Sequence, residues 1–313
     1  MKRISRLRDA ARSAFRSWRS GAPAPESGGS SESNGYVPFQ PTNFKLDAPP
    51  LCTNLFLHAR NTSNMGDLAA NPGDYFTLPG QSESGDFWSS VNRGVVDYDN
   101  IIVGGGVYAN NFAKKPEYFR RLNPKKHLII WGAGLENPGG PAMASELVER
   151  SSLIGTRDYR SASAGRNKVF FCPCSSAMDR AFDVTRPEPV HEVVCFTHHN
   201  KAYPGNPLRG YPTMHNYGDF IEAIDFLASG KIVITDSYHG LYWATLLSKK
   251  VVCLERGGKF NVTFKWQPVY ASPSRHRDAL ENADDIPFYP DALRECRELN
   301  MQFYARVLNL LTR

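Results

Sequence analysis

The stretch that decides the fold is residues 231–248, KIVITDSYHGLYWATLLS. It opens with a short run of β-branched residues at 232–235, which is typical of a buried strand. A polar elbow from Asp236 to Gly240 (DSYHG) follows, and the apolar residues after it predict a helix. A strand that turns directly into a helix is the repeating unit of α/β folds with parallel sheets. Because ligands in such folds bind at the carboxyl ends of the strands, the elbow is the predicted ligand site.

The elbow also carries the residue types that an anion site needs. A helix start offers unpaired N–H groups and the positive end of the helix dipole, which favour phosphate or carboxylate. His239 could donate a proton or serve as a charged clamp. A lone histidine near a helix start is more often a structural residue, but His239 stands beside hydroxyls and a carboxylate at a strand end. We therefore take His239 as the centre of the predicted chemistry.

Further short apolar runs lie on both sides of this stretch, and glycine or polar residues follow them. Runs of this kind predict strands of parallel sheets that are covered on both faces. The expected strands are residues 51–59, 100–103, 127–131, 153–156, 168–172, 192–197, 232–235 and 250–254, with helices at 217–229 and 290–313.

The length of 313 residues predicts two domains of about 150 residues each. A proline-marked break at 183–191 separates them. We expect a first α/β domain at 45–185, a second at 186–289 that holds the predicted ligand site, and a closing helix at 290–313.

The net charge of +6 comes entirely from the beginning of the chain. Residues 1–21 hold seven basic side chains and one acidic one, while the other 292 residues hold 30 of each sign. The globular part therefore gives no electrostatic case for binding nucleic acid. Residues 1–20 form a basic amphipathic segment that fits either a helix on an anionic membrane surface or a disordered tail. Residues 21–44 have the composition of a flexible linker.

Composition limits the class of protein in other ways. No segment approaches the about 18 to 20 unbroken apolar residues of a membrane span, and no apolar signal core is present near residue 1. We expect a cytoplasmic protein, with peripheral contact at the inner face of the membrane as a hypothesis for residues 1–20. Cys172-Pro-Cys174 lacks the spacing of redox or zinc motifs, and no third ligand accompanies His198-His199 at metal-ligand spacing, so we predict no metal site. For a cytosolic chain of this size we also expect no disulfide framework.

Candidate binding residues also stand at other strand ends. Gly104, Gly105 and Gly106 allow a ligand to approach the backbone closely, but they do not form a dinucleotide fingerprint, and tight turns explain them equally well. Arg157 could hold a phosphate or carboxylate with its planar fork, or could form a structural pair with Asp158.

Two candidates lie in the second half of the chain. His198 follows the strand at 192–197 and could contact a substrate, although a solvated loop histidine is the simpler interpretation. Lys259, in the glycine-rich RGGK sequence that begins at Arg256, suits anion binding, yet a loop lysine is usually just solvated.

Taken in order, these residues resemble the polysaccharide pyruvyl transferase family over roughly residues 50–260. No single motif is specific. The ordered series is considerably stronger than any one motif, and its last element is the most distinctive. The series is Asn64-x-Gly66-Asp67, Gly104-Gly105-Gly106, Gly132-Ala133-Gly134, Arg157-Asp158 and Thr235-Asp236-Ser237-Tyr238-His239-Gly240.

The resemblance implies two Rossmann-like domains that face each other across a cleft, as in GT-B glycosyltransferases. It implies transfer of the pyruvyl group of phosphoenolpyruvate to a sugar of an exopolysaccharide or cell-surface glycan repeat unit, often lipid-linked, with release of phosphate. No cofactor or metal is implied.

The resemblance also implies roles for individual residues. His239 is the implied general acid or phosphate-side clamp, and Asp67 is the second catalytic candidate. Some family members have an arginine where this chain has Ser237, so another cation must bind the donor. The implied donor-binding residues are Arg157, Ser237, Lys259 and Arg256, and those of the acceptor side and cleft are Asn64, Gly66, Gly104, Gly105, Gly106 and His198.

Two other classes of function stay open. A GT-B glycosyltransferase that uses a nucleotide sugar would share the two domains and the phosphate site. A catalytically inactive, membrane-associated scaffold would share the fold and the basic segment.

Overall fold

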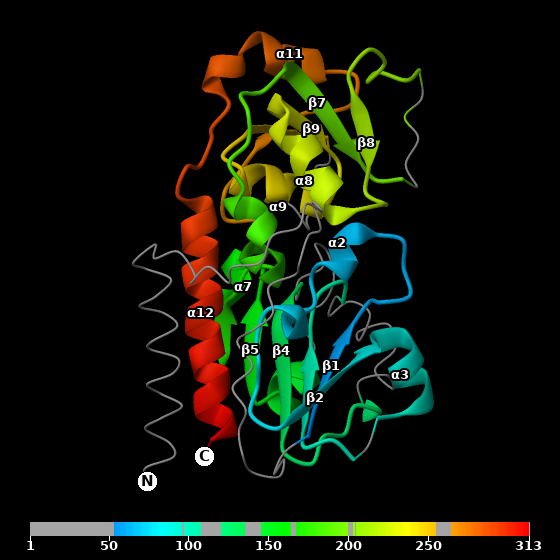
Figure 1. Ribbon diagram of the computed structural model, residues 1–313, viewed down its shortest axis with the longest axis vertical. Helices are drawn as coiled ribbons and strands as arrows, with labels where there is room; N and C mark the ends of the chain where they lie inside the picture. Colours follow the sequence, from blue (N-terminus) through cyan, green and yellow to red (C-terminus); the bar gives the residue numbers. More distant parts are fainter. Residues whose placement is uncertain are drawn as a thin grey trace, which may run out of the picture.

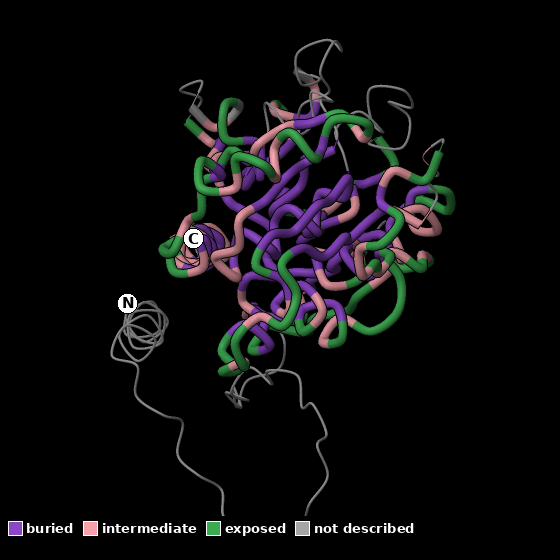
Figure 2. Tube along the Cα trace, turned by 90° about the horizontal axis from the view of Figure 1, so that it is seen from above, coloured by how far each residue is buried: buried purple, intermediate pink, exposed green. Residues whose placement is uncertain are grey.

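The computed structural model describes residues 53–95, 97–107, 120–134, 145–163, 167–199, 203, 205–254 and 264–312. Two parallel sheets lie one above the other along the long axis of the molecule (Figure 1). Buried segments run through the middle of the molecule and exposed segments surround them (Figure 2). The predicted fold class, two α/β domains with parallel sheets, is confirmed. The predicted segments at 1–20 and 21–44 lie outside the described residues, and the exact domain limits stay a prediction.

The first sheet has six parallel strands in the order β2-β1-β3-β4-β5-β6. Its central strands are buried because apolar residues fill both faces, as the continuous apolar runs predict. The strands are β1 (Thr53–His58), β2 (Gln81–Asp86), β3 (Asn100–Val103), β4 (His127–Ala133), β5 (Leu153–Thr156) and β6 (Val169–Phe171).

The second sheet has five parallel strands in the order β11-β10-β9-β7-β8. The strand of the opening stretch, β9, lies at its centre and pairs with β7 and β10. The strands are β7 (His191–Thr197), β8 (Thr213–His215), β9 (Gly230–Thr235), β10 (Lys250–Cys253) and β11 (Val269–Tyr270).

Short helices connect the strands within each part. The α-helices of the described residues are α2 (Met65–Leu68), α3 (Phe87–Arg93), α6 (Ser145–Arg150), α7 (Tyr159–Ser163), α8 (Phe220–Ala228), α9 (Tyr238–Leu246), α11 (His276–Glu281) and α12 (Ala292–Leu311). The 3-10 helices are η1 (Pro72–Asp74), η2 (Ser175–Met178), η3 (Arg180–Asp183) and η4 (Ala283–Asp285).

Helix α9 follows β9 after a two-residue turn, and all nine of its residues are buried. A helix that is apolar on every side must be enclosed by protein, and α9 packs against α8 and α12. Ser237 caps it, because its hydroxyl accepts the N–H of Gly240 at 3.5 Å. The polar elbow thus forms the first turn of a completely buried helix.

The last helix, α12, returns to the first sheet and runs beside it (Figure 1). Phe303 and Val307 belong to the same apolar cluster as Trp131 of β4, and the Trp131 indole donates to Asn300 Oδ1 at 3.3 Å. The chain therefore leaves the first domain after η3 and comes back to it at the end, so two segments connect the domains.

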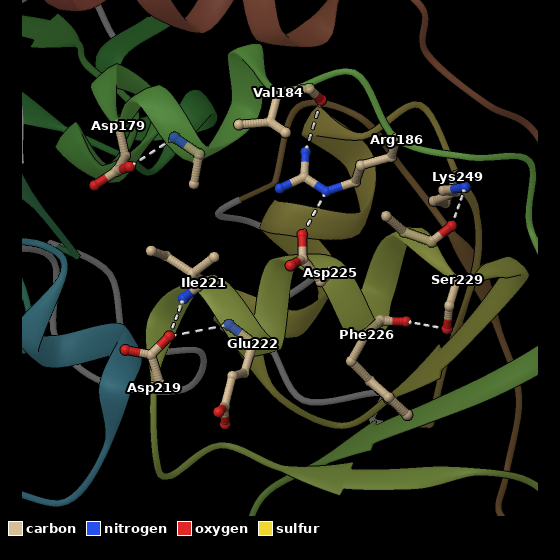
Figure 3. A network of polar contacts seen from close by, with 12 residues as sticks. Asp179, Val184, Arg186, Asp219, Ile221, Glu222, Asp225, Phe226, Ser229 and Lys249 are labelled. Carbon is tan, nitrogen blue, oxygen red and sulfur yellow. Dashed lines mark hydrogen bonds and ion pairs between the residues drawn. The ribbon is translucent and has the colours of Figure 1, made fainter. Parts of the chain in front are cut away.

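The segment that enters the second domain is attached to α8 (Figure 3). The Arg186 guanidinium donates to Asp225 Oδ1 at 2.7 Å and to the carbonyl of Val184 at 3.1 Å. Asp219 caps α8 by accepting the N–H groups of Ile221 and Glu222. These contacts fix the connecting segment against the second domain.

One apolar cluster crosses from the first domain to the second. Met65, Cys174 and Ala177 share it with Tyr242 and Trp243 of α9. The Tyr242 hydroxyl donates to the carbonyl of Cys174 at 2.9 Å. The carboxyl ends of β6 and β9 therefore meet at this contact. No helix in the described part of the chain has the length and apolar character needed to span a membrane.

Candidate functional site

His239 lies in the first turn of α9, at the contact between the two domains, and is only 4% exposed. Its Nε2 atom is 3.6 Å from the thiol of Cys174, which follows β6 in the first domain. The ring packs 5.2 Å from those of Tyr238 and Trp243, measured between centroids. The imidazole is therefore held on several sides and has little freedom to turn.

Gly66 of α2 lies directly against the other side of the His239 ring. A Cβ atom at position 66 would be 2.0 Å from His239 Nδ1, which only glycine avoids. Asn64 caps α2, since its Oδ1 accepts the Gly66 N–H at 3.1 Å, and its Nδ2 donates to Asp67 Oδ2 at 3.1 Å. The Asn-x-Gly-Asp motif therefore presents its glycine to His239.

The three glycines after β3 pack against α2 and the segment that follows it. A Cβ at Gly105 would be 1.9 Å from that of Ala70, and a Cβ at Gly106 would be 2.9 Å from Asp67. Gly106 also has φ +72°, a conformation that favours glycine. Gly104 packs against Pro72 in the same way. This run lets the end of β3 approach α2 and η1, so Gly104 and Gly105 touch protein, while Gly106 lies beside Asp67.

Arg157 is buried at the end of β5, only 3% exposed. Its guanidinium carbon lies 3.9 Å above the ring of Tyr238, the first residue of α9, in a cation–π contact. The neighbouring Asp158 is fully buried. The permanent positive charge of Arg157 thus lies over the residue next to His239, although Arg157 and His239 are 82 positions apart in the sequence.

Cys174 is the site residue that sequence reasoning missed. Its thiol contacts His239 Nε2, and it also lies 3.2 Å from the Ser176 hydroxyl, which accepts the Trp243 indole N–H at 3.1 Å. Burial raises the pKa of the Cys174 thiol. A protonated thiol can donate to a neutral imidazole or accept from a charged one, so it can hold the His239 ring in both states. Its position three residues after β6, near a strand end, was the available signal.

Asp236 has a structural role in the elbow. It is 1% exposed, and its carboxylate accepts the backbone N–H of His198 and the hydroxyl of Tyr203, both at 2.6 Å. These bonds hold the segment after β7 against β9. His198 is thereby kept beside the elbow, with its ring stacked on His199 at 4.9 Å.

The structure therefore brings Gly66, Arg157, Ser237 and His239 together, with Asn64 and Asp67 beside them. Lys259 and Arg256 lie outside the described residues. A cavity of about 360 Å³ lies elsewhere, between the connecting segment and the ends of α8 and α9, where Arg186 and Lys249 line it. No group of side chains in the described ranges has the arrangement of a metal site.

The sequence profile of the polysaccharide pyruvyl transferase family matches residues 55–258, which include every site residue that the structure describes. The chain belongs to this family. In this family member, the match begins in β1 and ends beyond β10, so both sheets contribute to it. The match includes Arg256, Gly257 and Gly258 of the RGGK segment and ends one residue before Lys259. The resemblance drawn from the ordered motifs is confirmed.

Solved structures show distant similarity to this pyruvyl transferase family member. The HepE protein of Anabaena, in complex with UDP and glucose, is 11% identical with a TM-score of 0.47, covering 83% of this chain and 96% of its own. UDP-GlcNAc 2-epimerase from Neisseria meningitidis, bound to UDP-GlcNAc, is 12% identical with a TM-score of 0.46, covering 83% and 99%. No curated protein matches the chain at a significant level.

Proposed function

We propose that this family member transfers the pyruvyl group of phosphoenolpyruvate to two hydroxyls of one sugar in a glycan repeat unit. The product is a cyclic ketal that carries a carboxylate, and phosphate leaves. The observation that carries the proposal is the meeting of His239 with Gly66 at the start of α9, where the Arg157 guanidinium lies over the ring of the adjacent Tyr238. Three motifs that are far apart in the sequence thus meet at the first turn of α9.

The donor side of the proposal rests on positive charge in an enclosed place. Phosphoenolpyruvate carries about three negative charges near neutral pH, so its site needs cations and N–H donors. Arg157 and the first turn of α9, capped by Ser237, supply both. We propose that Lys259 and Arg256 supply the remaining positive charge, in place of an arginine at position 237.

The low exposure of this site strengthens the charge interactions that would hold the donor. Arg157, Ser237 and His239 are 3%, 5% and 4% exposed, so a donor bound among them would be removed from water. Charge interactions are stronger in such surroundings. Entry of the donor requires a local opening of the contact between Gly66 and His239.

The proton balance assigns the roles. The first sugar hydroxyl adds to the central carbon of the enol, and a proton must reach the methylene carbon, which becomes a methyl group. His239 donates that proton, and Asp67 accepts the proton of the attacking hydroxyl from the side of α2. The second hydroxyl then replaces phosphate at the same carbon, and its proton leaves with the phosphate. The reaction as written needs no metal ion and no nucleotide.

In the proposal, the acceptor sugar binds beside α2 and the segment after β7. Asn64, Asp67 and His198 line this acceptor side, while Gly66 and Gly106 let α2 pack closely on His239 and on the end of β3. We further propose that the acceptor is lipid-linked and that the basic residues 1–20 bind the anionic membrane surface. Equal binding of the full chain and a chain lacking residues 1–20 to anionic liposomes would contradict this last point.

Thermal unfolding tests the donor directly. Phosphoenolpyruvate should raise the melting temperature of the purified full-length protein, because a ligand that binds the folded state stabilises it. UDP and GDP should leave the melting temperature unchanged. A rise with UDP or GDP and none with phosphoenolpyruvate would favour a nucleotide-sugar glycosyltransferase and overturn the proposal.

A further inference from the structure

A band of ring side chains lies at the carboxyl edge of the second sheet, and it extends outward from His198 of the proposed acceptor side. His198 and His199 follow β7, His215 ends β8, and Tyr217 follows it. The ring centroids of His198 and His199 are 4.9 Å apart, those of His199 and Tyr217 are 5.9 Å apart, and those of His215 and Tyr217 are 5.9 Å apart. We refer to these four residues as the ring platform.

The ring platform is open to solvent. Tyr217 is 52% exposed, His215 is exposed, and His198 and His199 are partly buried. Single apolar residues scattered on a surface need no explanation. Here four rings contact one another in series along one edge, which is a larger and more ordered surface than a scattered aromatic residue gives.

A buried amide lies within the ring platform. Asn216 is 1% exposed, and its Oδ1 accepts the backbone N–H of His199 at 2.9 Å. Because a backbone N–H can only donate, this bond identifies the oxygen and therefore also the nitrogen of the amide. The Asn216 Nδ2 atom is buried and has no hydrogen-bond partner in the described part of the chain. An unused buried donor is unfavourable, and a ligand or water that accepts from it relieves this.

The ring platform adjoins the candidate active site. The carbonyl of Asn216 accepts the N–H of Met65 at 3.1 Å, and the next residue, Gly66, packs on His239. His198 is bound through its N–H to Asp236, three residues before His239. Figure 1 shows α2 directly below the connection from β8 to α8. A molecule that extends from His239 past α2 would therefore cross the ring platform.

We propose that the ring platform binds the sugar next to the one that receives the pyruvyl group. This inference rests on the proposed function and names a second acceptor subsite, so the acceptor is an oligosaccharide chain. A pyranose ring has an apolar C–H face and a rim of hydroxyls. Exposed Tyr217 and His215 provide ring faces for stacking, and the Asn216 amide and the imidazoles provide partners for hydroxyls.

Substitution of Tyr217 tests the proposal on an array of defined mono- to hexasaccharides. Full-length wild type should bind saccharides of two or more sugars, and Tyr217→Ala should weaken this binding about tenfold. Tyr217→Trp keeps a ring and should stay within about twofold of wild type. Phe288→Ala removes an equally exposed aromatic side chain, 54% exposed, from the end of the second domain and should change nothing.

Three results would overturn the inference. The first is that wild type binds no saccharide, and the second is that wild type and Tyr217→Ala bind saccharides equally well. The third is that wild type binds UDP and that Tyr217→Ala loses this binding while saccharide binding is unaffected. The melting temperature with phosphoenolpyruvate separates this inference from the proposed function. If saccharide binding depends on Tyr217 but phosphoenolpyruvate does not stabilise the protein, only the donor proposal fails. If phosphoenolpyruvate stabilises wild type and Tyr217→Ala equally, and saccharide binding does not depend on Tyr217, only the ring-platform inference fails.

Discussion

The first turn of α9 and the ring platform lie next to each other but differ sharply in exposure. His239 is 4% exposed and is enclosed by Gly66, Cys174 and Trp243, whereas Tyr217 is 52% exposed. Both stand at the carboxyl edge of the second sheet, so the same topology has produced a closed site and an open one.

The difference in exposure indicates that the first turn of α9 and the ring platform have different functions. A group that moves a proton must be held within a fraction of an ångström, and packing from both domains holds His239 in this way. A surface that accepts different sugars along a chain needs flat rings and solvent access, which Tyr217 and His215 offer. Changes in the enclosed site should therefore alter turnover, and changes in the open one should alter affinity.

Removing the imidazole should have the largest effect. We expect His239→Ala to lower turnover by about 1,000-fold, the size typical of a general acid, while saccharide binding on the array stays as in wild type. Phosphate release and product mass measure turnover, and a melting curve shows whether the fold is kept. His239→Gln, which retains a polar side chain, is the matched control and should be equally inactive. Substantial turnover in either folded variant would remove His239 from the mechanism.

Crowding the imidazole should have the next largest effect. Gly66→Ala places a methyl group where His239 Nδ1 now lies 2.0 Å away, so the ring must move. A displacement of about 1 Å can lower turnover by about 100-fold. The control is Gly85→Ala in β2, whose added Cβ would come no closer than 3.3 Å to a neighbour. If both variants turn over at the wild-type rate, Gly66 does not position His239.

Removing the partner of the imidazole should have a smaller effect. Cys174→Ala deletes the contact with Nε2, and we expect turnover to fall about tenfold, as for loss of one positioning hydrogen bond. Cys174→Ser restores a donor and acceptor and should recover part of the loss. The pH profile of turnover separates positioning from simple destabilisation, because only loss of the contact shifts the profile. An unchanged profile in Cys174→Ala would contradict the role given to the thiol.

Burial of another histidine, His58 at the end of β1, predicts that the free energy of unfolding depends modestly on pH. Burial is the main cause that lowers the pKa of His58 from 6.5 to about 4. The unfolded chain therefore binds more protons than the folded one between these values, so stability falls as the pH falls through this window. Between about pH 7 and 5.5 the loss should be about 1 kcal/mol. Denaturant titrations of His58→Gln should lack this part of the slope.

Much of the fold could be predicted from the sequence, and the misses have a common cause. The central strands β3, β4 and β9 are continuous apolar runs because both faces of the sheet are covered. The edge strand β2 has the sequence QSESGD and is mostly exposed, so no apolar run marks it. The edge strands β8 and β11 are three and two residues long, too short for any periodicity to appear.

The site was predictable only where one rule applied, namely that ligands bind at strand ends. That rule selected His239 and Arg157, the family resemblance added the Asn-x-Gly-Asp loop, and the structure brings these together. Cys174 and Asn216 were missed because their importance comes from contacts across the chain, with His239 and with Met65. For Asn216 such a contact leaves no local signal, and for Cys174 the sequence shows only its position after a strand.

Product formation tests the central claim most directly, that the two domains assemble a phosphoenolpyruvate-dependent transferase around His239. The full-length protein should be incubated with phosphoenolpyruvate and defined saccharides, free and lipid-linked. The account predicts equal amounts of released phosphate and of saccharide heavier by one pyruvyl ketal, both formed about 1,000-fold more slowly by His239→Ala and about 100-fold more slowly by Gly66→Ala. Saccharide extension from a nucleotide sugar without any use of phosphoenolpyruvate, or ketal formation by His239→Ala at the wild-type rate, would contradict it.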